Sequence, residues 1–133
     1  MCTCVRATWA PYANLVSNIE SNSYHCLSIN SFVEPNQAAQ MVARTRHQVK
    51  LPLMVEFRII SNNKRRLVRL ARAAAAAGAN AILLTSDDFA SVQTVLSEIY
   101  RAVTLPLLVR CPIVNKNEEQ KLQALGAAQV TPL

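Results

Sequence analysis

Short apolar runs and helical patterns alternate along the chain from about residue 23 to its end. The apolar runs lack polar alternation, which is typical of parallel strands covered by helices. Residues 1–22 form an unassigned lead, and residues 23–133 form a single (βα) repeat domain. We predict strands at 25–30, 51–59, 79–85, 105–111 and 128–131, and helices at 35–48, 62–77 and 116–125, with a fourth helix capped by Ser86 or Asp87 and ending at Ala102.

Proline and glycine mark the ends of several predicted helices. Pro35 suits the first turn of a helix, where its missing N–H costs nothing. Gly78 and Gly126 follow two predicted helices and supply the left-handed residue that helix ends prefer. These signals support the element boundaries independently of the apolar pattern.

The chain also repeats itself after about 54 residues. This shift places 49–53 (VKLPL) on 103–107 (VTLPL), and Glu34 on Asp88. The repeated unit therefore contains two strands and two helices, which is how (βα) barrels are built. With 133 residues the chain is too short for a complete barrel of about 250. We predict an α/β fold, a partial TIM-barrel-like parallel sheet of about five strands; the alternative is a flavodoxin- or receiver-like open sheet.

Positive charge is concentrated in one predicted helix. The formal net charge is +6, and Arg65, Arg69 and Arg72 share one helix face at i, i+4 and i+7; Lys64 and Arg66 add to the same run. No aromatic residues interleave with the patch, so we do not expect nucleic acid as a partner. Docking on an acidic surface or a gain in solubility accounts better for the charge.

The cysteines do not form a metal-binding pattern. Cys2 and Cys4 are spaced C-x-C, without the C-x₂-C pairs of common zinc sites, and we predict no metal. Cys26 and Cys111 are isolated, and reduced thiols in an intracellular, cytoplasmic protein are expected, with organelle import left open. No apolar run reaches the roughly 20 residues that span a bilayer, so no membrane association is expected.

Candidate reacting groups lie at the carboxyl ends of the predicted strands, where barrel enzymes place their chemistry. Glu56 and Arg110 occupy equivalent positions of the repeat, and Arg58 shares a strand face with Glu56. Two guanidiniums can hold a phosphate or carboxylate while Glu56 orients them. The alternative is a buried structural Glu56–Arg110 ion pair.

Three further charged residues follow the strands. Asp87 and Asp88 suit acid–base work or Mg²⁺ binding, but helix capping explains them better. Lys116 is a candidate anion ligand beside Arg58 and Arg110. With only 2 glycines the chain has no phosphate-binding glycine loop, and we predict no cofactor. The predicted site thus consists of Glu56, Asp88 and Arg110 as catalytic residues, with Arg58, Arg110 and Lys116 for an anion.

From about Val49 to Val130 the chain resembles the indole-3-glycerol-phosphate synthase branch of phosphate-binding barrels. Residues 77–85 (AGANAILLT) followed by 87–89 (DDF) are similar to that family's A-G-A-x-A-I-x-x-L-T-D-x-x-F stretch, and 103–108 (VTLPLL) to its V-S-L-P-V-L. The resemblance implies a barrel that acts on a phosphorylated small molecule. However, Arg110 stands where the family has its catalytic lysine, and Arg58 where an earlier segment, A-E-x-K, has another. An arginine stays protonated and cannot replace a lysine of tuned pKa.

A second resemblance is to response-regulator receivers, which contain a five-stranded (βα)5 sheet. Residues 81–84 (AILL) and 125–133 (LGAAQVTPL) are similar to the receiver's I-L-L-D and L-G-A-D-D-Y-L-T-K-P-F. Thr85 would then replace the phosphorylated aspartate, which implies a pseudo-receiver signalling domain.

The leading functional hypothesis is a catalytically degraded half-barrel with a structural or interaction role, forming a homo-oligomer or joining a larger protein assembly. The first alternative is a phosphosugar or carboxylate lyase or isomerase of the synthase type. The second is the pseudo-receiver.

Overall fold

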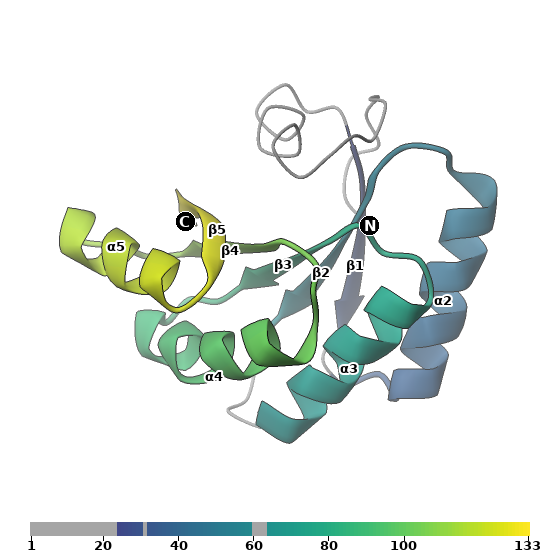
Figure 1. Cartoon of the computed structure of the whole chain (residues 1–133), viewed down its shortest axis with the longest axis horizontal. Coiled ribbons are helices and arrows are strands. Elements are labelled where there is room, and N and C mark those ends of the chain that lie inside the picture. The colour runs from purple at the N-terminus through teal and green to yellow at the C-terminus, as the bar shows by residue number, and fades with distance from the viewer. Residues whose placement is uncertain (1–23, 31, 60–63) are drawn as a thin grey trace.

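Five parallel strands alternate with four helices in the computed structural model, which describes residues 24–30, 32–59 and 64–133. Figure 1 shows the four helices gathered on one side of the sheet. The elements in chain order are β1 (His25–Asn30), α2 (Pro35–Gln48), β2 (Leu53–Arg58), α3 (Lys64–Ala76), β3 (Ala81–Thr85), α4 (Phe89–Ala102), β4 (Leu107–Cys111), α5 (Lys116–Ala124) and β5 (Ala127–Pro132).

The strands follow one another in space in the order β1-β2-β3-β4-β5, and every neighbouring pair is parallel. Parallel strands joined by a helix have right-handed crossovers in nearly all proteins. When each strand adds to the same side of its predecessor, such crossovers place every helix on the same face. The flavodoxin-like order 2-1-3-4-5 instead puts the first strand inside the sheet. The observed order therefore favours the partial (βα) repeat over the receiver-like alternative.

The main hydrophobic core lies between the sheet and its four helices. Each helix contributes at least one fully buried side chain, among them Val42, Leu70, Leu96 and Leu122. Phe57, on the second strand, is also fully buried in this core. Burying one such side chain stabilises the fold by about 1.5–3 kcal/mol relative to leaving it in water. The helix-facing half of each strand is therefore fixed by packing.

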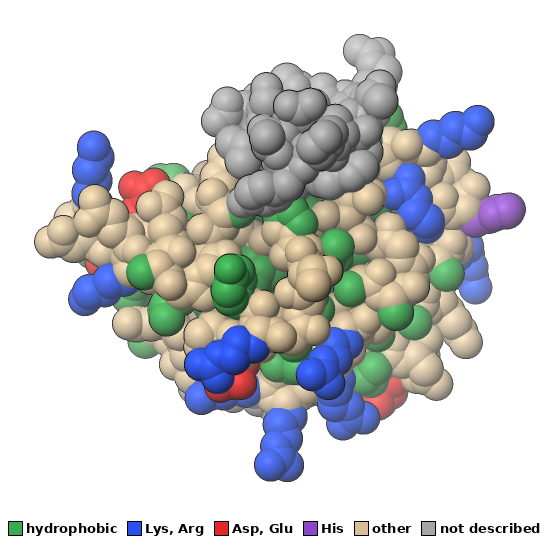
Figure 2. Space-filling view, viewed as in Figure 1, with side chains coloured by type: hydrophobic (Ala, Val, Ile, Leu, Met, Phe, Trp, Pro, Cys, Tyr) green, Lys and Arg blue, Asp and Glu red, His purple; other side chains and the backbone are tan. Residues whose placement is uncertain are grey.

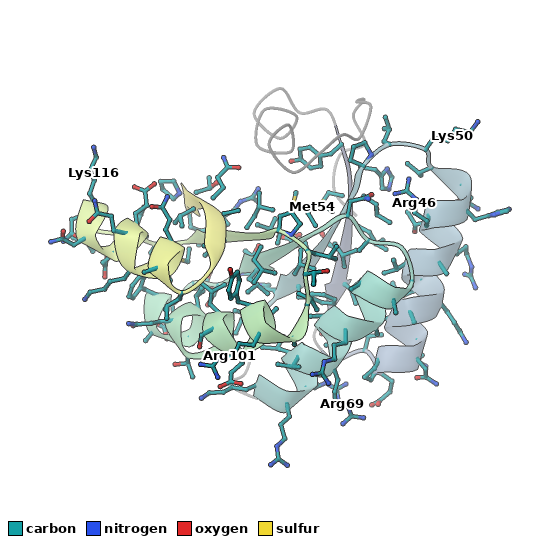
Figure 3. The ribbon with its side chains drawn as sticks, in the orientation of Figure 1. Arg46, Lys50, Met54, Arg69, Arg101 and Lys116 are labelled. Atoms are coloured by element: carbon teal, nitrogen blue, oxygen red, sulfur yellow. The ribbon has the colours of Figure 1, made fainter. Side chains whose placement is uncertain are left out.

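The opposite face of the sheet carries a second, smaller buried cluster. Its members come from β1 to β4 and are Cys26, Met54, Ala81, Leu83 and Leu108. Met54 is labelled in Figure 3. Because successive residues of a strand point to opposite faces, these residues alternate with those of the main core. Both faces thus contain apolar side chains, which explains why the strand sequences lack polar alternation.

The predicted elements are confirmed to within two or three residues at their ends. The repeat is confirmed as well: α2 and α4 begin 54 residues apart and end 54 residues apart, and β2 and β4 begin 54 residues apart. Glu34 and Asp88, equivalent in the repeat, both occupy the N-cap of their helices. The prediction that Ser86 or Asp87 caps the fourth helix was wrong, since the chain turns one residue later. Residues 1–22, Ser61 and the start of the predicted helix at 62 lie outside the described residues.

Arg46, in the last turn of α2, ties together the segments that enter the sheet. Its guanidinium donates to the side-chain oxygen of Asn80 at 2.6 Å and to the carbonyls of Val49 and Leu51 at 2.5 and 2.6 Å. The same Asn80 oxygen accepts from the backbone N–H of Leu53 at 2.8 Å. The stem of Arg46 also passes close to Gly78, whose φ is +116° and where a Cβ atom would lie 2.8 Å from Cγ of Arg46. Gly78 is therefore required both for its backbone angle and for this contact.

We predict that Arg46→Met lowers the free energy of unfolding by about 2 kcal/mol, because the hydrogen bonds of one charged group are lost while its aliphatic stem is kept. Urea denaturation would measure the change. Arg44→Met is the matched control: Arg44 is exposed on the same helix and should change stability by less than about 0.5 kcal/mol. Equal effects of the two substitutions would contradict the role given to Arg46.

His25, at the start of β1, is buried, and neither of its ring nitrogens has a hydrogen-bond partner among the described residues. Burial, followed by the nearby charge of Arg46, lowers the pKa of His25 below its ordinary value of 6.5. The folded chain therefore keeps this imidazole neutral at a pH where the unfolded chain already binds a proton. The stability that results is present above the unfolded pKa and is lost as the pH falls below it.

We predict that the free energy of unfolding falls between about pH 7 and about pH 5, and that His25→Leu makes this fall smaller. Urea denaturation at several pH values would measure both slopes. His47→Leu changes an exposed histidine of α2 and should keep the wild-type slope. An unchanged slope in His25→Leu would show that other groups cause the pH dependence.

Candidate functional site

Five polar side chains lie level with one another across the carboxyl end of the sheet. The pairing register aligns Asn30 with Arg58, Arg58 with Thr85, Thr85 with Arg110 and Arg110 with Thr131. Residues that are direct partners across neighbouring strands point to the same face. We call these five residues the carboxyl-end layer. They lie on the face of the sheet opposite the helices, one pair beyond Glu56.

Glu56 is held by hydroxyl groups from both neighbouring strands. The hydroxyl of Ser28 donates to Oε1 at 2.5 Å, and the hydroxyl of Thr85 donates to Oε2 at 2.6 Å. Ser28 is the direct partner of Glu56 on β1, whereas Thr85 lies two residues beyond its partner on β3. Both carboxylate oxygens accept hydrogen bonds in this arrangement, which is the geometry of a group used as a structural acceptor.

Arg110 does not form the ion pair with Glu56 that the repeat suggested. Glu56 is level with Leu83, and Leu83 with Leu108, so Arg110 lies two residues farther along its strand, with β3 between the two side chains. The alternative of a structural Glu56–Arg110 ion pair was therefore wrong. Arg110 is half-buried, and its side chain has no hydrogen-bond or ion-pair partner among the described residues.

Arg58 is the second guanidinium of the carboxyl-end layer. Its Nη2 atom lies 3.2 Å from Oδ1 of Asp87, and the two side chains are 57% and 75% exposed. An ion pair as exposed as this one contributes little to stability. Arg58 and Arg110 are separated by one strand, so their backbones are about 10 Å apart. The structure thus brings two cations to the same edge, with a carboxylate already beside one of them.

The other two predicted site residues belong to helix starts. Asp88 caps α4: its Oδ1 accepts from the backbone N–H of Ala90 at 3.2 Å, and its Oδ2 from the hydroxyl of Ser91 at 2.9 Å. Lys116 is the first residue of α5 and is exposed, and Figure 3 shows its side chain pointing away from the sheet. Neither residue forms a hydrogen bond or ion pair with Glu56 or Arg110.

A hollow of about 320 Å³ opens at the carboxyl end of β1 and β2. It is lined by Ser28, Ile29, Asn30, Glu56 and Arg58. A larger hollow, of about 580 Å³, lies at the opposite end of the sheet, between the start of β4 and the ends of α4 and α5. Its lining includes Asn80, Gln123 and Tyr100 but no acid or base that titrates near neutrality. The smaller hollow is therefore the better candidate for chemistry or anion binding.

Sequence reasoning missed the hydroxyls of Ser28 and Thr85. Both residues sit inside apolar strand sequences, and only the register places them beside Glu56. The signal was the alternation along each strand, which assigns Ser28 and Thr85 to the same face as Glu56 once the sheet is parallel and consecutive.

Metal and thiol chemistry have little support in the described part of the chain. No group of three or more His, Cys, Asp or Glu side chains is placed there to hold a metal ion. Cys111 is fully buried, and burial raises the pKa of its thiol, as do the nearby carboxylates of Glu118 and Asp88. A thiol with a raised pKa is a poor nucleophile at neutral pH.

Comparison of the sequence with protein-family models and with curated proteins finds no match. Among the described residues, no helix is both long enough and apolar enough to cross a membrane. The interpretation of the carboxyl-end layer therefore depends on its geometry.

We predict that Thr85→Val, which keeps the shape of the side chain, lowers the free energy of unfolding by about 1–3 kcal/mol because one oxygen of Glu56 loses its donor. Thr94→Val is the matched control: Thr94 is exposed on α4, and its hydroxyl bonds only the carbonyl of Ala90 in its own helix. The control should change stability by less than about 0.5 kcal/mol. A double-mutant cycle with Glu56→Gln would give no coupling if the Thr85–Glu56 bond were unimportant.

Proposed function

We propose that the chain is a catalytically degraded, barrel-like (βα) module that acts by binding rather than by turnover. The observation that carries the proposal is the engagement of both candidate acid–base groups. Glu56 accepts hydroxyl hydrogen bonds at both oxygens, and Asp88 uses both oxygens to begin α4. A carboxylate committed to such bonds is a poor general base, because proton transfer would break the contacts that hold it.

The resemblance to indole-3-glycerol-phosphate synthases supports the same proposal. At the position of that family's catalytic lysine this chain has Arg110, whose guanidinium stays protonated at any working pH. A permanent cation can still bind a phosphate or carboxylate. We therefore propose that Arg110 retains the anion-binding part of a barrel site and that Arg58 assists it. Lys116 would join them only if its side chain turned toward the sheet.

The open sheet supports an assembly role. In the described residues, β1 pairs only with β2, and β5 pairs only with β4. A strand with one neighbour presents unpaired backbone N–H and C=O groups that invite pairing with another chain. A homo-oligomer, or a larger protein assembly, would cover these edges. We propose a second copy of the chain as the first candidate partner.

We predict that the purified chain forms an even oligomer at micromolar concentration and that inorganic phosphate raises its melting temperature. Light scattering would give the mass, and thermal unfolding with and without phosphate would report binding. Arg110→Ala should abolish the phosphate effect, because the cation that lacks a protein partner is removed. Arg44→Ala is the matched control, since Arg44 is exposed on α2 and should leave the effect unchanged.

A monomer at this concentration would overturn the assembly proposal, and a phosphate effect that survives in Arg110→Ala would overturn the anion site. The hollow beside Ser28, Glu56 and Arg58 favours a second candidate, a lyase or isomerase of the synthase type acting on a phosphorylated small molecule. Formation of indole-3-glycerol phosphate by the wild-type chain, lost in Arg110→Ala, would replace the binding function with this enzymatic one.

A further inference from the structure

A basic groove lies between α3 and α4, on the outer surface of the helical layer. Its volume is about 470 Å³, and its lining consists of Lys64, Arg65, Val68, Arg69, Arg72 and Glu98. Figure 2 shows Lys and Arg side chains gathered at the lower edge of the molecule, over α3 and α4, and Figure 3 labels Arg69 and Arg101 there. This surface is separate from the carboxyl-end layer.

The fold does not use the four cations of this groove. Arg66, in the same run, donates to the carbonyls of Phe32 and Val33 and contacts Glu34 at 3.5 Å, so it connects α3 to the start of α2. In contrast, the structure records no ion pair or side-chain hydrogen bond for Lys64, Arg65, Arg69 or Arg72 within the described ranges. All four are exposed.

Their position makes α3 less stable than a neutral sequence would. The first turn of α3 contains no acidic residue and begins with Lys64, Arg65 and Arg66. Cations at a helix N-terminus oppose the helix dipole, and like charges three or four residues apart repel one another. A local arrangement that costs stability without a compensating contact in the fold is typical of a functional surface.

The spacing of the cations matches the face of another helix. Arg65, Arg69 and Arg72 project from successive turns and extend over about 10 Å. Val68 is half-buried at the floor of the groove and offers an apolar contact. Glu98 lines the α4 side, 3.9 Å from Arg101.

We propose that this groove docks an acidic, amphipathic helix of a partner protein, with carboxylates at i, i+4 and i+7 that pair with Arg65, Arg69 and Arg72. An apolar side chain of the partner helix contacts Val68. Nucleic acid fits less well, because no aromatic side chain lines the groove for base stacking. The carboxylate of Glu98 also opposes a continuous phosphate backbone, whereas a peptide can place a neutral or basic residue opposite it.

Two fluorescent peptides of identical composition test the proposal with the full chain. One carries Glu at i, i+4 and i+7 around a single Leu in a helical Ala-rich background, and the other has the same residues in scrambled order. Fluorescence anisotropy should show that the ordered peptide binds more tightly and that added salt weakens it. Arg65→Glu, Arg69→Glu and Arg72→Glu together should weaken binding about tenfold or more, from the loss of three exposed ion pairs.

The matched control reverses three exposed cations elsewhere, Arg44→Glu, Lys50→Glu and Lys121→Glu, and gives the same change in net charge. It should keep at least half of the wild-type affinity. Circular dichroism checks folding, and Arg65→Gln, Arg69→Gln and Arg72→Gln provide a milder variant that should also weaken binding. Equal binding of both peptides, equal effects of the two reversals, or tighter binding of a DNA oligonucleotide at the same salt concentration would each overturn the proposal.

Discussion

The consecutive order of the five parallel strands is the constraint on which the rest of this structure depends. Because each strand adds to the same side of its predecessor, right-handed crossovers place all four helices on one face. Each strand residue then faces either the helical core or the opposite side, according to its position in the alternation. The same order brings the carboxyl ends of all the strands to one edge, where Arg58, Thr85 and Arg110 become neighbours.

At that edge the polar groups are divided between structural and open roles. Glu56 and Asp88 are engaged by hydroxyls and by backbone or side-chain donors, while Arg110 is half-buried without a partner among the described residues. A site of this kind retains the positive charge needed to bind an anion and has little capacity to move protons. This division favours binding over catalysis, and it agrees with arginine at the position where the resembled family has a lysine.

The two positively charged regions differ in how the fold treats them. Arg46 and Arg66 are tied into the fold by carbonyl groups, so their charges contribute to structure. The cations at the groove of α3 have no such contacts and are arranged at a regular helical spacing. Residues of one type in one short run therefore separate into structural and surface groups, and only the contacts distinguish them.

The sequence by itself determined the element order, the boundaries to within a few residues, the repeat and the helix ends at Gly78 and Gly126, because apolar periodicity and left-handed glycines act locally. Only the tertiary structure decided which polar groups meet. Glu56 and Arg110 are equivalent in the repeat but are not paired, whereas Ser28 and Thr85, inconspicuous in the sequence, hold both oxygens of Glu56. The physical reason is register: a contact between strands depends on how far each strand is shifted against its neighbour, and no residue within a single strand encodes that shift.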